Sequence, residues 1–205
     1  MGILTTNVTL TRYHIVEAVP DALWTEIPSR LKRFAFKDID QTVDERSVGW
    51  TSFDNMLDTY WHETQPEKGE FLALALRLET RRLSPAIYKK HLQIKQKAAE
   101  DELKKSGRKF LSHDQKKELR EQVRLQLISR CLPVPAIFDV VWNTKENIVY
   151  FSSANSKAIS LFTEYFTATF ELHLDPLTPY SLTLRLMGEA AQQRLETLEP
   201  TNFIT

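Results

Sequence analysis

A long charged helical pattern between residues 84 and 131 interrupts a sequence that otherwise predicts strands. Ser84-Pro85 is a typical helix start, with proline at the first helical position, and the first helix is expected to end at the loop SGRK. Ser112 and Gln115 form a capping-box pattern that predicts a second helix, ending near Cys131. Two helices joined by a short loop lie antiparallel, so the sequence predicts a helical hairpin.

Each predicted helix carries a narrow apolar stripe and is otherwise charged. The second helix has Leu119, Val123, Leu127 and Cys131; the first has Ile87, Ile94 and Ala98, with Tyr88, Leu92, Ala99 and Leu103 beside them. Because a narrow stripe covers only one neighbour, we expect the two helices to pack along these positions.

Strand patterns lie on both sides of the hairpin. We predict strands at 7–16, 34–39, 48–53, 71–79, 137–142 and 148–152, a loop at 172–179, and further helices from Asp21, at 155–170 and at 182–198 with an interruption at Gly188. The sequence therefore predicts an α+β fold, with an antiparallel or mixed sheet, packed helices and an inserted basic hairpin. The expected division is a body at 1–83, the hairpin at 84–131 and the rest of the body at 132–205.

The charge of the chain is strongly polarised. Its formal net charge is zero, with 27 Lys or Arg and 27 Asp or Glu. The window from Arg77 to Arg130 nevertheless holds 16 Lys or Arg against 7 Asp or Glu, a net charge of +9, and the other residues hold 11 against 20. A basic surface of this kind suits the phosphate backbone of a duplex.

The basic residues recur with helical spacing, which predicts rows of positive charge. Few aromatic residues lie among them, so duplex binding is favoured over single-strand stacking. The predicted DNA contacts are Arg77, Arg81, Arg82, Lys89, Lys90, Lys97, Lys104, Lys105, Arg108, Lys109, Lys116, Lys117, Arg120 and Arg124. The alternative is a merely solvated hairpin, in which Glu100, Glu102, Glu118 and Glu121 neutralise the lysines of their own helix.

Signatures of catalysis are absent from the sequence. The five histidines show no metal-ligand spacing, no glycine-rich phosphate loop occurs, and Cys131 is the single cysteine. We therefore predict no catalytic residue, metal or cofactor, and no membrane-spanning run. A metal-dependent exonuclease using Asp38 and Asp40 stays open as an alternative, with Glu17, Asp44, Glu45, Asp54 or Asp58 joining only if the fold gathers them.

The order of these segments resembles the RdgC family of bacterial recombination-associated proteins. The likeness rests on NVTLTRYHI, on RFAFKDI followed by VGW, on LALRLETRRLSPAIYKKHL, on the lysine-rich helix KKELREQVRLQLISRCLP, and on FDVVWNTKENIVYFSSANSKAISLF. It covers nearly the whole chain, and we expect a short member that lacks the family's C-terminal third.

The resemblance implies a DNA-binding protein with little sequence preference that favours duplexes and modulates recombination or replication. Family members form head-to-head dimers that close a ring around DNA, and they modulate the RecA recombinase. An older description of the family assigns exonuclease activity. We accordingly expect a homodimer in the cytoplasm, associated with the nucleoid. A module that docks an acidic protein partner through the hairpin is the remaining alternative.

Overall fold

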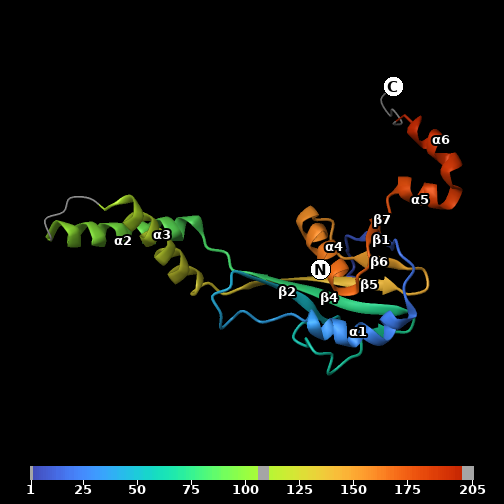
Figure 1. Ribbon diagram of the computed structural model, residues 1–205, viewed down its shortest axis with the longest axis horizontal. Helices are drawn as coiled ribbons and strands as arrows, with labels where there is room; N and C mark the ends of the chain where they lie inside the picture. The colour runs from blue at the N-terminus through green and yellow to red at the C-terminus, as the bar shows by residue number, and fades with distance from the viewer. Residues whose placement is uncertain (1, 106–110, 200–205) are drawn as a thin grey trace. The chain divides into compact units, whose positions relative to one another are not determined.

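The computed structural model describes residues 2–105 and 111–199, and it confirms the predicted α+β fold (Figure 1). Its strands are β1 (Thr11–Ile15), β2 (Arg46–Ser52), β3 (Glu67–Lys68), β4 (Phe71–Thr80), β5 (Val134–Asn143), β6 (Ile148–Phe151) and β7 (Leu174–Pro176). Its helices are α1 (Asp21–Arg33), α2 (Pro85–Lys105), α3 (His113–Ile128), α4 (Ser156–Phe170), α5 (Pro179–Met187), the short 3₁₀ helix η1 (Glu189–Ala191) and α6 (Gln192–Glu196). None of the helices in these described parts of the chain is long and apolar enough to cross a membrane.

The strands of the described residues form one sheet in the order β2-β4-β5-β6-β1-β7, with β3 beside β4. β1 pairs antiparallel with both β6 and β7, and β5 pairs antiparallel with β6. The predicted strands at 137–142 and 148–152 are confirmed as β5 and β6, which form a β-hairpin. The side chain of Asn143 closes its turn by accepting the backbone N–H groups of Lys145 and Glu146 at 3.1 Å.

The chain divides into two compact units. The first comprises Met1–Ala35, Trp50–Leu76 and Ile137–Thr205, and the second comprises Phe36–Gly49 and Arg77–Ala136. Strands β2, β4 and β5 contribute residues to both units, because the unit boundaries fall within them.

The first unit has an aromatic core built on one face of α4. Phe162, Phe166 and Phe170 recur every four residues on this helix and are buried. Phe162 stacks on Phe151 of β6 with ring centroids 4.2 Å apart, while Trp142 of β5 contacts both Phe166 and Phe170. The predicted helix at 155–170 is therefore confirmed as α4, and the side chain of Asn155 caps its start.

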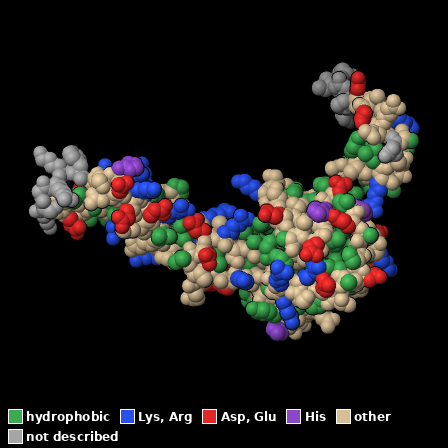
Figure 2. Space-filling model, viewed as in Figure 1, with side chains coloured by type: hydrophobic (Ala, Val, Ile, Leu, Met, Phe, Trp, Pro, Cys, Tyr) green, Lys and Arg blue, Asp and Glu red, His purple; other side chains and the backbone are tan. Residues whose placement is uncertain are grey.

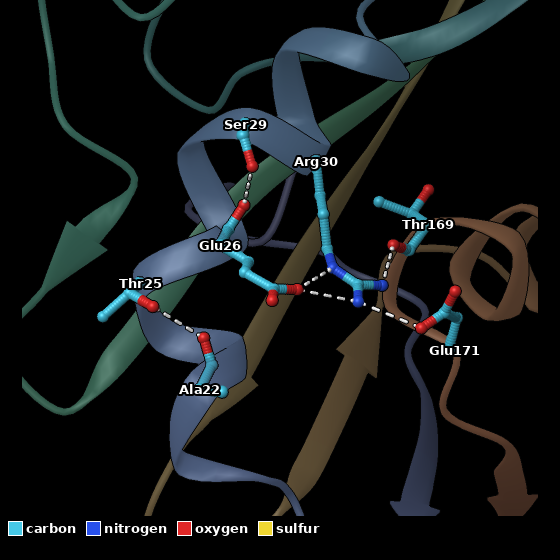
Figure 3. Close-up of polar contacts among 7 residues, drawn as sticks. All are labelled: Ala22, Thr25, Glu26, Ser29, Arg30, Thr169 and Glu171. Carbon is cyan, nitrogen blue, oxygen red and sulfur yellow. Dashed lines mark hydrogen bonds and ion pairs between the residues drawn. The ribbon is translucent and has the colours of Figure 1, made fainter.

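Helix α1 reaches the same core, since the Trp24 ring lies 5.1 Å from that of Trp142. Arg30 then ties the two helices together (Figure 3). Its guanidinium donates to the carboxylates of Glu26 and Glu171 and, at 3.0 Å, to the backbone oxygen of Thr169. A cation at the C-terminal end of a helix satisfies carbonyls that have no partner within the helix.

Three sequence expectations outside the helical hairpin need correction. Residues 34–39 do not form a strand, since only Ala35 bridges to Trp50. The predicted loop at 172–179 contains β7, whose pairing with β1 depends on a distant partner. The predicted helix at 182–198 starts earlier, at Pro179, and is broken as expected at Gly188, where φ is 72°.

The second unit contains the antiparallel hairpin of α2 and α3 (Figure 1). The capping box is confirmed, because Ser112 Oγ accepts from Gln115 N at 3.2 Å and Gln115 Oε1 accepts from Ser112 N at 3.0 Å. Helix α3 ends at Ile128 rather than near Cys131. The division at residues 84 and 131 stays a prediction.

The apolar positions predicted for α2 divide into two stripes that differ in burial. Tyr88, Leu92, Ala99 and Leu103 are half-buried, whereas Ile87 and Ile94 are 49% and 54% exposed and Ala98 is also exposed. Helix α3 offers a single seam, in which Val123 and Leu127 are buried. Because one seam covers one side of α2, the second stripe stays exposed on this helix.

Candidate nucleic-acid interface

Three lysines of α2 form a row on the side of the helix away from α3. Lys90, Lys97 and Lys104 are exposed and seven residues apart, so they lie on one side with a drift of about 20° per step. The helical period places them opposite Leu92 and Ala99, which are half-buried. We call these three residues the α2 row.

A second row lies on α3. Lys117, Arg120 and Arg124 are exposed and follow the spacing i, i+3, i+7. The helical period of about 3.6 residues places this α3 row beside the buried seam that contains Val123, and not on the opposite side of the helix. The two rows therefore belong to different sides of the hairpin.

Most of these cations have no ion-pair partner in the described residues. Lys104 pairs with Asp101 at 3.3 Å and Arg124 pairs with Glu45 at 2.9 Å. Among residues 2–105 and 111–199, no salt bridge joins Lys90, Lys97 or Lys117 to a carboxylate. Within the described part of the hairpin, Lys104 is therefore the one lysine paired with an acidic residue of its own helix, whereas the solvated-hairpin alternative requires such pairs throughout. Figure 2 shows blue and red side chains interspersed along the visible face of the hairpin.

Other predicted contacts have varied surroundings. Arg82 and Lys89 are exposed near the start of α2, whereas Lys116 is half-buried in the seam. Arg108, Lys109 and the side chain of Lys105 lie outside the described residues.

Arg81 was predicted to contact DNA, but its side chain is buried in the second unit and is only 6% exposed. Its guanidinium donates to five backbone carbonyls, which belong to Ile39, Asp40, Thr42, Ile128 and Cys131. Two of these carbonyls belong to Ile128, the last residue of α3, and to Cys131, three residues beyond it. Arg81 therefore joins segment 39–42 to the end of α3, and its burial is at odds with a phosphate contact.

Arg77 was also predicted to contact DNA, and it too is buried. Its guanidinium forms an ion pair with Glu79 on the same strand and lies 4.2 Å from the ring centroid of Phe36. An arginine with an internal carboxylate and an aromatic partner serves the packing of the second unit. The spacing of basic residues does not reveal which of them the sheet covers.

A pocket of about 450 Å³ lies at the base of the hairpin, within the second unit. Its charged lining groups are Glu45, Arg81 and Arg124, and its other lining residues are Leu83, Pro85, Tyr88 and Ile128. The Tyr88 hydroxyl donates to the backbone oxygen of Arg120 at 3.4 Å. Tertiary folding brings Glu45 to Arg124 across 79 positions of sequence, so no local signal could have placed Glu45 in this site.

The carboxylates considered for an exonuclease take part in separate contacts with different partners. Asp38 accepts the backbone N–H of Asp40 at 2.6 Å, and Asp54 and Glu45 pair with Lys68 and Arg124. Three backbone N–H groups donate to Asp58, and together they hold the pKa of this carboxyl below its usual value even though burial acts to raise it. In the part of the chain that the structure describes, no group of three or more His, Cys, Asp or Glu side chains is arranged to hold a metal ion.

The fold and this surface define the class of protein: an α+β protein that presents a basic helical hairpin with largely unpaired cations. The sequence model of a family described as "Putative exonuclease, RdgC" matches residues 9–189. The chain therefore belongs to the RdgC family of recombination-associated proteins. No curated protein shows a significant match to the chain.

Proposed function

We propose that this protein binds duplex DNA without sequence specificity and acts in homologous recombination or replication. The observation that carries the proposal is the pair of exposed basic rows on the hairpin, whose lysines, apart from Lys104, lack carboxylate partners among the described residues. Membership of a recombination-associated family supports the same conclusion.

The dimensions of the α2 row suit a phosphate backbone. Its first and last lysines are 14 residues apart, which corresponds to about 21 Å along the helix. A duplex carries one negative charge per roughly 1.7 Å of its axis, so a row of this length faces several phosphates. Each neutralised phosphate releases counterions, and this release supplies the free energy of binding.

Contacts of this type give affinity without sequence preference. Lysine is a compact point charge that recognises phosphate rather than the edge of a base. The exposed contacts in the proposal are the α2 and α3 rows together with Arg82 and Lys89, while the buried Arg77 and Arg81 hold the second unit together. The proposal includes a homodimer and a RecA-type recombinase as the regulated partner, both supported by the family resemblance.

The test reverses the charge of the α3 row in the variant K117E/R120E/R124E. Loss of three phosphate contacts should reduce the slope of log K against log salt by up to about 3 and weaken binding strongly at low salt. The matched control, R12E/K32E/K157E, makes the same change in net charge at exposed positions of the first unit. Fluorescence anisotropy with labelled duplexes of two unrelated sequences measures both quantities.

Two outcomes would contradict the proposal. Equal affinity and salt slope in the α3 variant and the wild-type protein, with unchanged circular dichroism, remove that row from the interface. Absence of any duplex binding at low salt, combined with capture of an acidic partner protein through the hairpin, favours a protein-docking module instead.

The family description favours exonuclease activity as a second candidate function. Incubation of end-labelled duplex with Mg²⁺ or Mn²⁺ tests it, using D38A/D40A as the comparison variant. Degradation that the wild-type protein supports and the variant does not would establish the nuclease.

A further inference from the structure

One of the residues that line the pocket at the base of the hairpin has a buried hydrogen-bond donor without an acceptor. Arg81 lines the pocket, and its Nε–H has no hydrogen-bond acceptor among the residues that the structure describes. Its two terminal nitrogens are fully engaged with backbone carbonyls, as described above. A buried donor without an acceptor is costly unless a ligand or solvent supplies one.

We propose that this pocket binds one unpaired nucleotide of DNA, and this inference rests on the DNA binding proposed above. The base would lie against the apolar wall, and its phosphate would contact Arg124 at the rim. Arg81 Nε–H would donate to a carbonyl oxygen or ring nitrogen of the base. The pocket, at about 450 Å³, lies within the range of about 300–1,000 Å³ typical of small-molecule sites.

The wall suits a flat, partly apolar ligand. Leu83, Pro85 and Ile128 line it with aliphatic surface, and the half-buried ring of Tyr88 adds an aromatic face. Every base has a π-face that stacks on such a ring, so the site has no need for a particular sequence. A simple inorganic anion would leave this apolar wall without a partner, which is why we favour a nucleotide.

The rim of the pocket carries an exposed ion pair in which a phosphate could replace the carboxylate. One terminal nitrogen of Arg124 donates to both carboxylate oxygens of Glu45, at 2.9 and 3.0 Å, and both side chains are about half exposed. An exposed ion pair of this kind contributes little to stability. A phosphate can therefore take the place of Glu45 at Arg124. The exposed cations Arg82 and Lys89 are adjacent in sequence to the lining residues Arg81 and Tyr88.

The experiment uses the full chain and two duplexes that differ by a single bulged 2-aminopurine. Stacking of the probe on Tyr88 should quench its fluorescence, and the bulged duplex should bind at least about fivefold more tightly than the intact one. Y88A should remove both effects and keep the affinity for the intact duplex, whereas Y88F should retain them because it preserves the ring. Circular dichroism confirms that each variant is folded.

E45Q provides a second, independent variant at an exposed position. Removal of the carboxylate frees Arg124, so binding of the bulged duplex should tighten by up to about fivefold, and by more than binding of the intact duplex. Failure of E45Q to tighten bulged-duplex binding would remove Arg124 as the phosphate contact of the pocket.

The results separate the two proposals. Equal affinity for bulged and intact duplexes, or quenching that survives Y88A, refutes the nucleotide pocket and leaves duplex binding standing. Absence of binding to either duplex refutes both. A preference for the bulge that disappears only in Y88A supports the pocket.

Discussion

Arg81 and Arg82 are neighbours in sequence with opposite roles in the structure, and methionine at each position separates these roles. In R81M the guanidinium disappears while most of the aliphatic chain remains. The two shortest hydrogen bonds of this guanidinium, which R81M removes, reach Cys131 O at 2.5 Å and Ile39 O at 2.6 Å. In R82M an exposed charge disappears with no described hydrogen bond.

The expected magnitude follows from the hydrogen bonds of Arg81. A hydrogen bond from a charged donor contributes about 1.5–3 kcal/mol. Two short bonds give about 3 kcal/mol at the lower value. The three longer ones are left out because Asp40 and Thr42 are exposed, so that their carbonyls regain water, and because Ile128 O keeps the backbone N–H of Cys131 as a donor at 3.0 Å. Ile39 O also accepts the backbone N–H of Thr42 at 3.0 Å, so this carbonyl keeps one donor in the variant. We expect R81M to lower the free energy of unfolding by about 3 kcal/mol and R82M to change it by less than about 0.5 kcal/mol.

Urea denaturation followed by circular dichroism measures the stability, and duplex anisotropy across a salt series measures DNA binding. R82M should reduce the salt slope by about 1, whereas folded R81M should bind like the wild-type protein. R81K retains the positive charge but not the planar guanidinium with its several N–H donors, so its stability should lie between those of R81M and the wild-type protein. A loss below about 1 kcal/mol in R81M, or equal losses in both variants, would refute the assigned role of the guanidinium.

Two further predictions concern the first unit. Two hydrogen bonds from His173 lower the pKa of the Glu17 carboxyl: first that of the backbone N–H, at 2.8 Å, and then that of the imidazole ring. H173A removes the ring and keeps the backbone N–H, so it should raise the pKa of Glu17 part of the way to its usual value. Carboxyl NMR shifts measure this change. Because the pKa of Glu17 is lower in the folded state, its contact with His173 stabilises the fold at pH values above the usual pKa of Glu, and this stabilisation is lost as the pH falls through the lowered pKa. The stabilities of H173A and the wild-type protein should therefore converge in acid. A Glu17 pKa that is unchanged in H173A would contradict this reasoning. Phe162 is fully buried and stacks on Phe151. F162A should therefore lower the free energy of unfolding, measured by urea denaturation, by about 3–5 kcal/mol, and F162L should lower it clearly less. A loss below about 1 kcal/mol in F162A would contradict the place of Phe162 in the core.

Local patterns were sufficient to predict most of the elements. The capping box at Ser112, the proline at the start of α2 and the aromatic face of α4 each depend on residues within one or two turns. The strand at 34–39 was wrong because an alternating pattern also suits an irregular segment that buries Phe36 and Ile39. Strand β7 was missed because its pairing with β1 depends on residues far away in the sequence.

The candidate site was predictable only in part. Helical spacing identified the two basic rows and the seam residue Val123, because side chains three, four or seven positions apart share a side of a helix. The same spacing could not choose between Ile94 and Leu92 for the packed stripe of α2, since both continue a helical pattern. The partner helix decided this by covering one side.

The sequence by itself determined the α+β class, the helical hairpin, its positive charge and the resemblance to the RdgC family, since all of these depend on composition and short-range order. Only the tertiary structure decided which arginines face solvent and which are structural. Arg81 and Arg82 differ because the carbonyls that surround Arg81 come from segment 39–42 and from the end of α3. The same folding placed Glu45 beside Arg124 and formed the pocket. Hydrogen bonding and burial depend on distances between remote segments, and these distances exist only once the chain has folded.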